Sequence, residues 1–232
     1  MKKTILIPCY NEENTIDIVI QKVKKNISND DNIIIIDDGS HDGTIEILKK
    51  YENDIQIECL YHPLNSGKGS AIITGIKKSK TINDIILIQD ADLEYNPEDY
   101  NKIFLPFYET NADVVYGSRF LGGGKYYRIH LFWHLVANKL LTFICNIMTN
   151  LNMTDMETGY KAFKKDVINK IQLNEKSFGI EPEITIKLAK KKFKFFEVPI
   201  SYNGRSYEEG KKIRLRDAFS AVYCIFRYKF FN

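Results

Sequence analysis

Short apolar segments alternate with amphipathic segments through the first half of the chain. Most of the apolar segments carry isoleucine, leucine or valine at nearly every position, which is typical of strands buried on both faces of a sheet. Between them, apolar residues recur every three or four positions, which predicts helices with one buried face. The predicted strands are 4–8, 33–36, 55–61, 85–89 and 113–117, and the predicted helices are 12–23, 42–51, 66–80 and one beginning near Pro97. This alternation indicates an α/β fold with a mostly parallel sheet and helices on both faces.

The second half has a less regular pattern. We expect one or two helices over 129–150, single helices over 181–192 and 214–231, a strand over 195–200, and a loop over 201–212. Because there is no internal repeat, low-complexity linker or clear boundary, we expect a single domain that spans residues 1–232.

Charge divides the chain more sharply than its overall net charge of +3 suggests. Residues 1–116 contain 12 Lys, no Arg and 20 acidic residues, a net charge of −8, whereas residues 117–232 have a net charge of +11. All six arginines lie in the second half. Because the guanidinium group matches phosphate geometry, this half is expected to contact anionic partners.

Polar residues follow four of the predicted strands, including Arg119 after 113–117, at the edge where parallel sheets bind ligands. Asp90 and Asp92 are two residues apart on an extended segment, so both carboxylates can face one Mg²⁺ or Mn²⁺ ion. Asp37 and Asp38 could accept hydrogen bonds from a nucleobase or a ribose, although capping of the next helix would account for one acid there. Tyr10 could stack on a base.

The segment around Lys68 looks at first like a phosphate-binding loop. Ser66-Gly67-Lys68-Gly69 contains the Gly-Lys pair of a Walker A motif, but His62 stands where that motif requires glycine. The segment is therefore expected only to permit a tight entry into a helix.

Five segments, in chain order, together resemble the motifs of the family 2 glycosyltransferases with a GT-A fold: TILIPCYNEENTI, IIIIDDGSHDGT, NSGKGSAI, DADLEYNPED and GSRF. The later segments TDMETGYKAF, FGIEPEIT and EVPISYNGRSYEEGKKI resemble the group of dolichol-phosphate mannose synthases and bacterial polyprenyl-phosphate hexosyltransferases. The resemblance covers nearly the whole chain.

This resemblance implies an inverting, metal-dependent transfer of a hexose, mannose or glucose, from a GDP- or UDP-sugar to dolichyl or undecaprenyl phosphate. It implies a donor half, 1–118, and an acceptor- and membrane-facing half, 119–232. The implied nucleotide-sugar-binding residues are Pro8, Tyr10, Glu12, Asp37, Asp38, Lys68, Asp90, Ala91, Asp92, Arg205 and Lys211. Asp90 and Asp92 would bind Mg²⁺ or Mn²⁺, Arg119 and Arg128 the acceptor phosphate, and the implied catalytic residues are Asp92, Arg119 and Asp155.

Other functions stay open at this point. A lipid phosphate is already largely ionised at neutral pH and needs no general base, whereas a hydroxyl acceptor would need one, and Asp155 and Glu157 are the candidates. A nucleotidyltransferase would need a Gly-rich loop after the first strand, which PCYNEEN lacks. A basic membrane- or nucleic-acid-binding module would leave the acids at the strand ends without a role. The resemblance implies no nucleic-acid partner.

The cellular location is expected to be the cytoplasmic face of a membrane. The four cysteines are scattered, so neither a disulfide framework nor a zinc site is expected. The apolar-rich stretch 131–151 contains His134, Asn138 and Lys139, so it is not expected to span a bilayer. Aromatic and basic residues in 126–144 and 214–231 instead predict peripheral binding, and a membrane-anchoring partner protein stays open.

Overall fold

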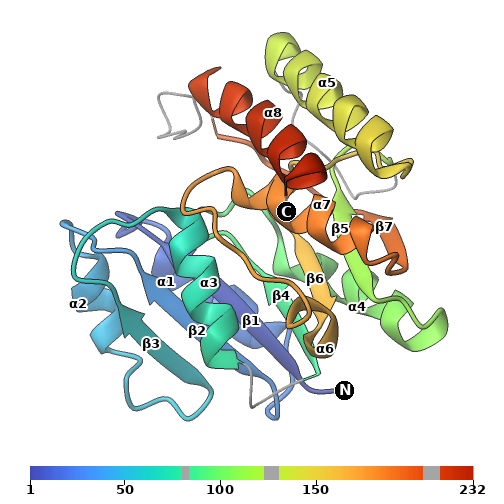
Figure 1. Cartoon of the computed structure of the whole chain (residues 1–232). Coiled ribbons are helices and arrows are strands. Elements are labelled where there is room, and N and C mark those ends of the chain that lie inside the picture. The colour runs from blue at the N-terminus through green and yellow to red at the C-terminus, as the bar shows by residue number, and fades with distance from the viewer. Residues whose placement is uncertain (80–83, 123–130, 206–214, 232) are drawn as a thin grey trace.

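A seven-stranded sheet forms the centre of the molecule, with strand order β3-β2-β1-β4-β6-β5-β7 (Figure 1). The computed structural model describes residues 1–79, 84–122, 131–205 and 215–231. The strands are β1 (Lys3–Cys9), β2 (Asn32–Asp37), β3 (Ile57–Tyr61), β4 (Ile85–Ile88), β5 (Val114–Ser118), β6 (Lys161–Lys164) and β7 (Phe195–Pro199). All neighbours are parallel except β6, which is antiparallel to both β4 and β5.

Helices cover both faces of this sheet (Figure 1). They are α1 (Ile16–Lys25), α2 (Thr44–Lys49), α3 (Lys68–Ser79), η1 (Pro97–Asp99), α4 (Tyr100–Glu109), α5 (Phe132–Thr149), α6 (Lys165–Ile168), α7 (Ile180–Lys190) and α8 (Leu215–Phe230). Side chains alternate along β1, so Ile5 and Ile7 pack with α1 and α4, whereas Leu6 packs with α3 and α7. Burial on both faces explains why these strands are apolar at consecutive positions.

The α/β fold expected from the sequence is confirmed, and each of the five strands expected in the first half is present. The helix expected from about residue 12 begins later, at Ile16, because Glu12 to Thr15 form a turn closed by the Thr15 amide donating to the Glu12 carbonyl. The sequence did not predict β6 and α6. The expected loop 201–212 is described only as far as Arg205, where Tyr202 forms an isolated bridge with Tyr95.

The strand order places the polar loops at one edge. β1 lies between β2 and β4. The chain runs from β1 outward to β2 and β3 and then returns to β4 on the other side of β1, which opens a crevice at the carboxyl end of β1. The residues that follow β1, β2, β4 and β5 therefore meet there. None of the helices that the structure describes has the length and hydropathy needed to cross a bilayer.

Candidate active site

A cavity of about 630 Å³ opens at the carboxyl ends of these strands. Its walls come from the ends of β1, β4 and β5, the start of α3, and α5 and α7. It brings together most of the residues that the sequence singled out: Pro8, Tyr10, Glu12, Asp38, Lys68, Asp90, Ala91, Asp92, Arg119 and Arg205. Arg128 and Lys211 lie outside the described residues.

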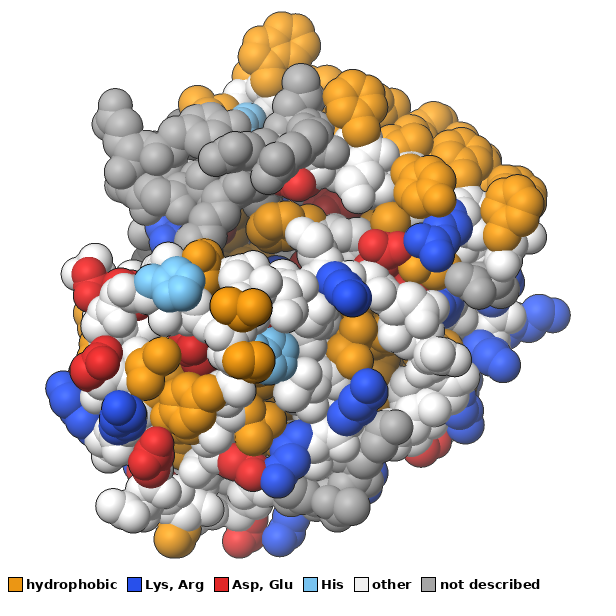
Figure 2. All heavy atoms as spheres, turned by 60° about the vertical axis from the view of Figure 1, so that its left-hand side comes forward, with side chains coloured by type: hydrophobic (Ala, Val, Ile, Leu, Met, Phe, Trp, Pro, Cys, Tyr) orange, Lys and Arg blue, Asp and Glu red, His pale blue; other side chains and the backbone are white. Residues whose placement is uncertain are grey.

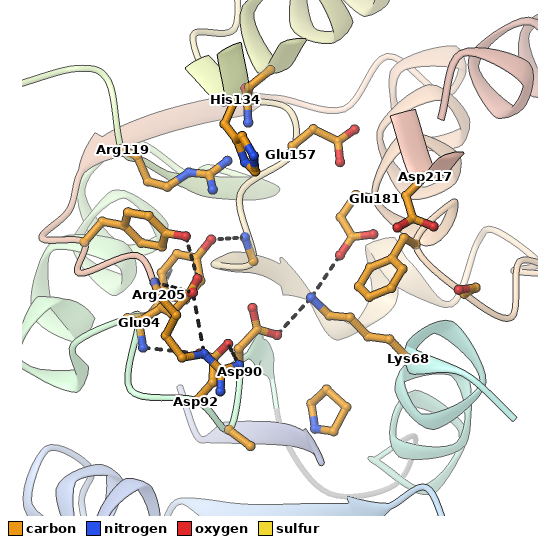
Figure 3. Close-up of a pocket in the computed structure, with 18 of the residues that line it drawn as sticks. Lys68, Asp90, Asp92, Glu94, Arg119, His134, Glu157, Glu181, Arg205 and Asp217 are labelled. Carbon is orange, nitrogen blue, oxygen red and sulfur yellow. Dashed lines mark hydrogen bonds and ion pairs between the residues drawn. The ribbon is translucent and has the colours of Figure 1, made fainter. Parts of the chain in front are cut away.

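Two carboxylates at the end of β4 are each paired with a cation. The Lys68 ammonium lies 2.9 Å from Asp90 Oδ1 and 3.0 Å from Glu181 Oε1, so it joins β4 to α7. Arg205 Nη2 donates to Asp92 Oδ2 at 2.7 Å. Figure 3 shows both pairs, with Asp90 and Asp92 next to each other on the cavity floor.

Negative charge accumulates around Asp92. Burial, together with the charges of Asp90 and Glu94, raises the pKa of Asp92 to about 7 even though Arg205 opposes the shift. A divalent cation would relieve this repulsion, and Mg²⁺ commonly binds one or two carboxylates together with substrate phosphates. The pair therefore fits such an ion. Among the described residues there is no cluster of three or more His, Cys, Asp or Glu side chains that could hold a metal ion.

Arg205 is held over the donor side of the cavity by three acids. Its guanidinium contacts Glu12 at 3.4 Å and Glu94 at 3.7 Å, in addition to Asp92. Glu94 also accepts hydrogen bonds from the Arg205 amide at 2.8 Å and from the Tyr202 hydroxyl. Arg205 is thus held by carboxylates from the segments that follow β1 and β4.

A bidentate pair fixes Arg119, whose guanidinium lies 5.1 Å from the centre of the Tyr202 ring. Arg119 Nε and Nη2 each donate to Asp155 at 2.7 Å, and its backbone amide donates at 3.0 Å. Asp155 is fully buried, which opposes its ionisation, but the charge and hydrogen bonds of Arg119 outweigh burial and keep the pKa of Asp155 below its usual value. Glu197 on β7 holds this loop by accepting from the amides of Thr154 and Asp155. Both oxygens of Asp155 are therefore used to orient Arg119.

The two acids after β2 have different environments. Asp37 is completely buried, accepts from the Ser40 amide at 3.1 Å and does not line the cavity. Asp38 does line it, but already accepts from the Gly67 amide at 2.7 Å and from His62. Asp37 thus closes the turn after β2 and caps no helix, since α2 begins only at Thr44, whereas Asp38 ties the cavity wall to the loop before α3. Gly67 has φ +96°, and a Cβ there would lie 2.3 Å from the Lys176 carbonyl oxygen.

Four residues of the site were missed by sequence reasoning: Glu94, Glu181, Glu197 and Tyr202. Glu94 extends the Asp90–Asp92 alternation by one more step, so its position could have been noted. Glu181, Glu197 and Tyr202 come from distant segments whose local patterns predict only a helix, a strand and a loop.

The sequence and the structure were then compared with known proteins. The glycosyl transferase family 2 profile matches residues 4–172. The chain is 31% identical to a UDP-N-acetylglucosamine–dolichyl-phosphate N-acetylglucosaminyltransferase of Methanococcus voltae, over 97% of this chain and 95% of that protein. It is 28% identical to an undecaprenyl-phosphate mannosyltransferase of Micrococcus luteus, over 91% of this chain and 87% of that protein.

One further relative and one solved structure are also similar to this chain. A dolichol-phosphate mannosyltransferase of Pyrococcus furiosus is 27% identical over 91% of this chain and 59% of that protein. Glucosyl-3-phosphoglycerate synthase of Mycobacterium tuberculosis, solved with Mn²⁺, uridine diphosphate and phosphoglyceric acid, superimposes with a TM-score of 0.75 at 16% identity, covering 100% of this chain and 79% of that one. The chain therefore belongs to glycosyl transferase family 2 and has the α/β fold of its GT-A-like members.

Proposed function

We propose that this protein transfers a sugar from a nucleotide-sugar to a polyprenyl phosphate, with inversion at the anomeric carbon. The observation that carries the choice of acceptor is the Arg119–Asp155 pair, which presents a fixed cation to the cavity and uses both oxygens of Asp155. The names of three relatives support the same acceptor class, since they act on dolichyl or undecaprenyl phosphate.

The donor nucleotide would lie across the ends of β1 and β4. Pro8, Tyr10 and Asp38 line the part of the cavity next to β1 and β2, which suits a nucleoside. Asp90 and Asp92 would hold Mg²⁺ or Mn²⁺, which supplies charge neutralisation for the diphosphate when bound. Arg205 is placed to move from Asp92 to the diphosphate, where it would stabilise the negative charge that develops on the leaving group.

The reaction requires no proton transfer. An oxygen of the lipid phosphate attacks the anomeric carbon and forms the new C–O bond. The bond from that carbon to the β-phosphate oxygen breaks, and the electron pair leaves with the nucleoside diphosphate. Because the second pKa of a phosphate monoester is about 6, the acceptor is already mostly a dianion at neutral pH. Arg119 would bind this dianion, and Asp155 would keep Arg119 in place.

A hydroxyl acceptor is the alternative, and it would need a base. Asp155 is already committed to Arg119, which leaves Glu157, a cavity residue whose pKa is raised to about 8 by burial and by the charge of Glu181. The phosphate acceptor is the simpler chemistry for this cavity.

A membrane surface would deliver the lipid. Figure 2 shows hydrophobic side chains along the upper edge of the molecule, where α5 and α8 lie in Figure 1. The exposed residues of these helices include Phe132, Trp133, Leu140, Phe143, Ile147, Phe219, Tyr223, Phe226 and Phe230. Exposed basic groups lie near these apolar residues: Arg227 on α8, and Lys190 to Lys192 at the end of α7. Apolar and basic residues together are expected where α5 and α8 bind the surface of an anionic membrane.

The resemblance of the motifs predicts mannose or glucose, and the Methanococcus voltae relative adds N-acetylglucosamine. A purified sample should be incubated with labelled UDP-N-acetylglucosamine, UDP-glucose or GDP-mannose, with Mg²⁺ or Mn²⁺ and a short polyprenyl phosphate. We expect label in the lipid phase from one of these donors and its loss in Asp92→Ala. The proposal is contradicted if no donor labels the lipid, and the metal assignment is contradicted if Asp92→Ala is as active as the wild type.

A further inference from the structure

Two carboxylate oxygens of the cavity have no hydrogen-bond partner among the described residues: Glu157 Oε1 and Glu181 Oε2. Glu181 is only 6% exposed, and its other oxygen accepts from Lys68 at 3.0 Å. A buried acceptor without a donor costs stability, so native proteins rarely keep one without a reason. Both residues line the cavity, so a bound ligand can supply the missing donors.

Both carboxyl groups are linked to the diphosphate end of the donor site. Lys68 bridges Glu181 to Asp90. Gly159, two residues after Glu157, lies against Asp90 so closely that a Cβ there would be 2.2 Å from Asp90 Oδ2. In Figure 3, Glu157 and Glu181 lie side by side between Arg119 and Asp217, with Asp90 and Asp92 on the cavity floor. The nucleoside side of the cavity is formed by β1 and β2, so the group that lies beyond the diphosphate is the sugar.

We propose that Glu157 and Glu181 bind the donor sugar through its hydroxyl groups, and that they restrict the donor to uncharged sugars and exclude hexuronic acids. This inference rests on the proposed function and specifies its donor. A sugar hydroxyl group can donate a hydrogen bond to the open oxygen of either carboxyl group, whereas a sugar carboxylate would bring a further negative charge beside Glu181.

The surrounding charges support this discrimination. The carboxyl group of Glu157 already responds to the charge of Glu181, which contributes to its raised pKa. Lys68 is the cation next to Glu181, and its ammonium is already paired with the carboxylates of Glu181 and Asp90. Lys161 is a buried cation whose charge acts on both Glu157 and Glu181, and its ammonium already donates to the carbonyl oxygens of Met156 and Thr158. Arg119 is the cation proposed for the acceptor phosphate.

The experiment is a calorimetric comparison of donor pairs in the presence of Mn²⁺. UDP, UDP-glucose and UDP-glucuronate differ only in the sugar, and GDP, GDP-mannose and GDP-mannuronate form the matching guanosine series. Each is titrated into the wild type, Glu157→Gln, Glu181→Gln and the control Glu58→Gln, a surface charge that pairs with Lys78 away from the cavity. We expect the wild type and the control to bind the neutral sugar more tightly than the uronate. Each cavity variant should bind the nucleotide-linked neutral sugar about 10- to 100-fold more weakly than the wild type, as loss of a hydrogen bond to a charged group predicts. The difference in affinity between the neutral sugar and the uronate should become smaller in each variant.

The nucleoside diphosphate itself should bind Glu157→Gln and the control Glu58→Gln within about twofold of the wild type, because neither residue shares the Lys68 bridge to Asp90. Equal loss of nucleoside diphosphate and nucleotide-sugar affinity in Glu157→Gln would overturn the inference, as would unchanged affinities in both variants or equal binding of hexose and uronate by the wild type. If neither nucleoside diphosphate binds the wild type, the proposed function fails as well. If nucleotides bind and discrimination does not depend on these acids, only the sugar assignment fails.

Discussion

Replacing Asp155 with Asn tests whether this residue positions Arg119 or acts as a base. The substitution keeps the shape of the side chain but removes the charge that faces a guanidinium whose side chain is 12% exposed. An amide has one acceptor oxygen, so it cannot accept from both Arg119 Nε and Nη2 through separate oxygens as Asp155 does. The Arg119 charge would then remain buried without its counter-charge.

The expected loss of stability follows from that geometry. Breaking a buried ion pair by removing one partner costs about 3–5 kcal/mol. For a chain of this size each kcal/mol shifts Tm by roughly 2–4 °C, so we expect a decrease of roughly 6–20 °C. Asp31→Asn is the matched control, because Asp31 is also a buried acid, paired with Lys3 and remote from the cavity.

The activity assay separates the two roles. A positioning role predicts that Asp155→Asn raises KM for polyprenyl phosphate, that donor affinity changes little, and that adding Arg119→Met to Asp155→Asn causes no further loss. Asp31→Asn should lower Tm without this change in KM. The reasoning is refuted if Asp155→Asn abolishes kcat at unchanged KM, removes the acidic limb of the pH–rate profile, and combines additively with Arg119→Met, since that is the behaviour of a general base.

Three further predictions follow from the same structure. Burial, and then the charge of Glu181, raise the pKa of Glu157 in the folded protein to about 8 from an ordinary value near 4.5. Between these pH values the folded state binds more protons than the unfolded state, so the free energy of unfolding should fall as pH rises from 5 to 8. Urea titrations of Glu157→Gln should show a shallower fall of this free energy with pH than the wild type. Because Arg205 competes for Asp92, Arg205→Gln should bind Mn²⁺ more tightly without nucleotide, yet bind the nucleoside diphosphate at least tenfold more weakly; unchanged Mn²⁺ affinity by electron paramagnetic resonance would contradict the competition. Trp133, on α5, has a side chain that is 76% exposed, so Trp133→Ser should lower the affinity for anionic vesicles, measured by flotation, roughly tenfold or more. Ile55→Ser, at an exposed side chain on the loop before β3, should leave this affinity unchanged. Equal flotation of the two variants would show that α5 does not contact the membrane.

The sequence predicted the fold well where the physical signal is local. Runs such as 33–36 are apolar at every position because both faces of β2 are covered. β6 was missed because two of its four residues are lysines. Lys161 is nonetheless buried, since its ammonium donates to the carbonyl oxygens of Met156 and Thr158, contacts that the sequence does not reveal.

The site was predictable as far as strand ends determine it. Asp90, Asp92 and Arg119 follow buried strands, so the rule for parallel sheets brings them to one edge. The same rule could not distinguish Asp37 from Asp38, because which of two adjacent acids faces the cavity depends on how the chain turns after β2. Nor could it place Glu181, which reaches the cavity from α7, about 90 residues beyond Asp90, only because α7 packs over the end of the sheet.

The most direct test of the central claim is a comparison of two acceptors that differ by one group. Polyprenyl phosphate and the corresponding polyprenol should be offered separately to the wild-type protein, with the donor that labels lipid and with Mn²⁺. The account predicts a labelled polyprenyl-phosphate sugar and no product from the alcohol, because Arg119 binds a dianion and Asp155 is not free to remove a proton. Transfer to the polyprenol at a rate equal to or above that for the phosphate would contradict it.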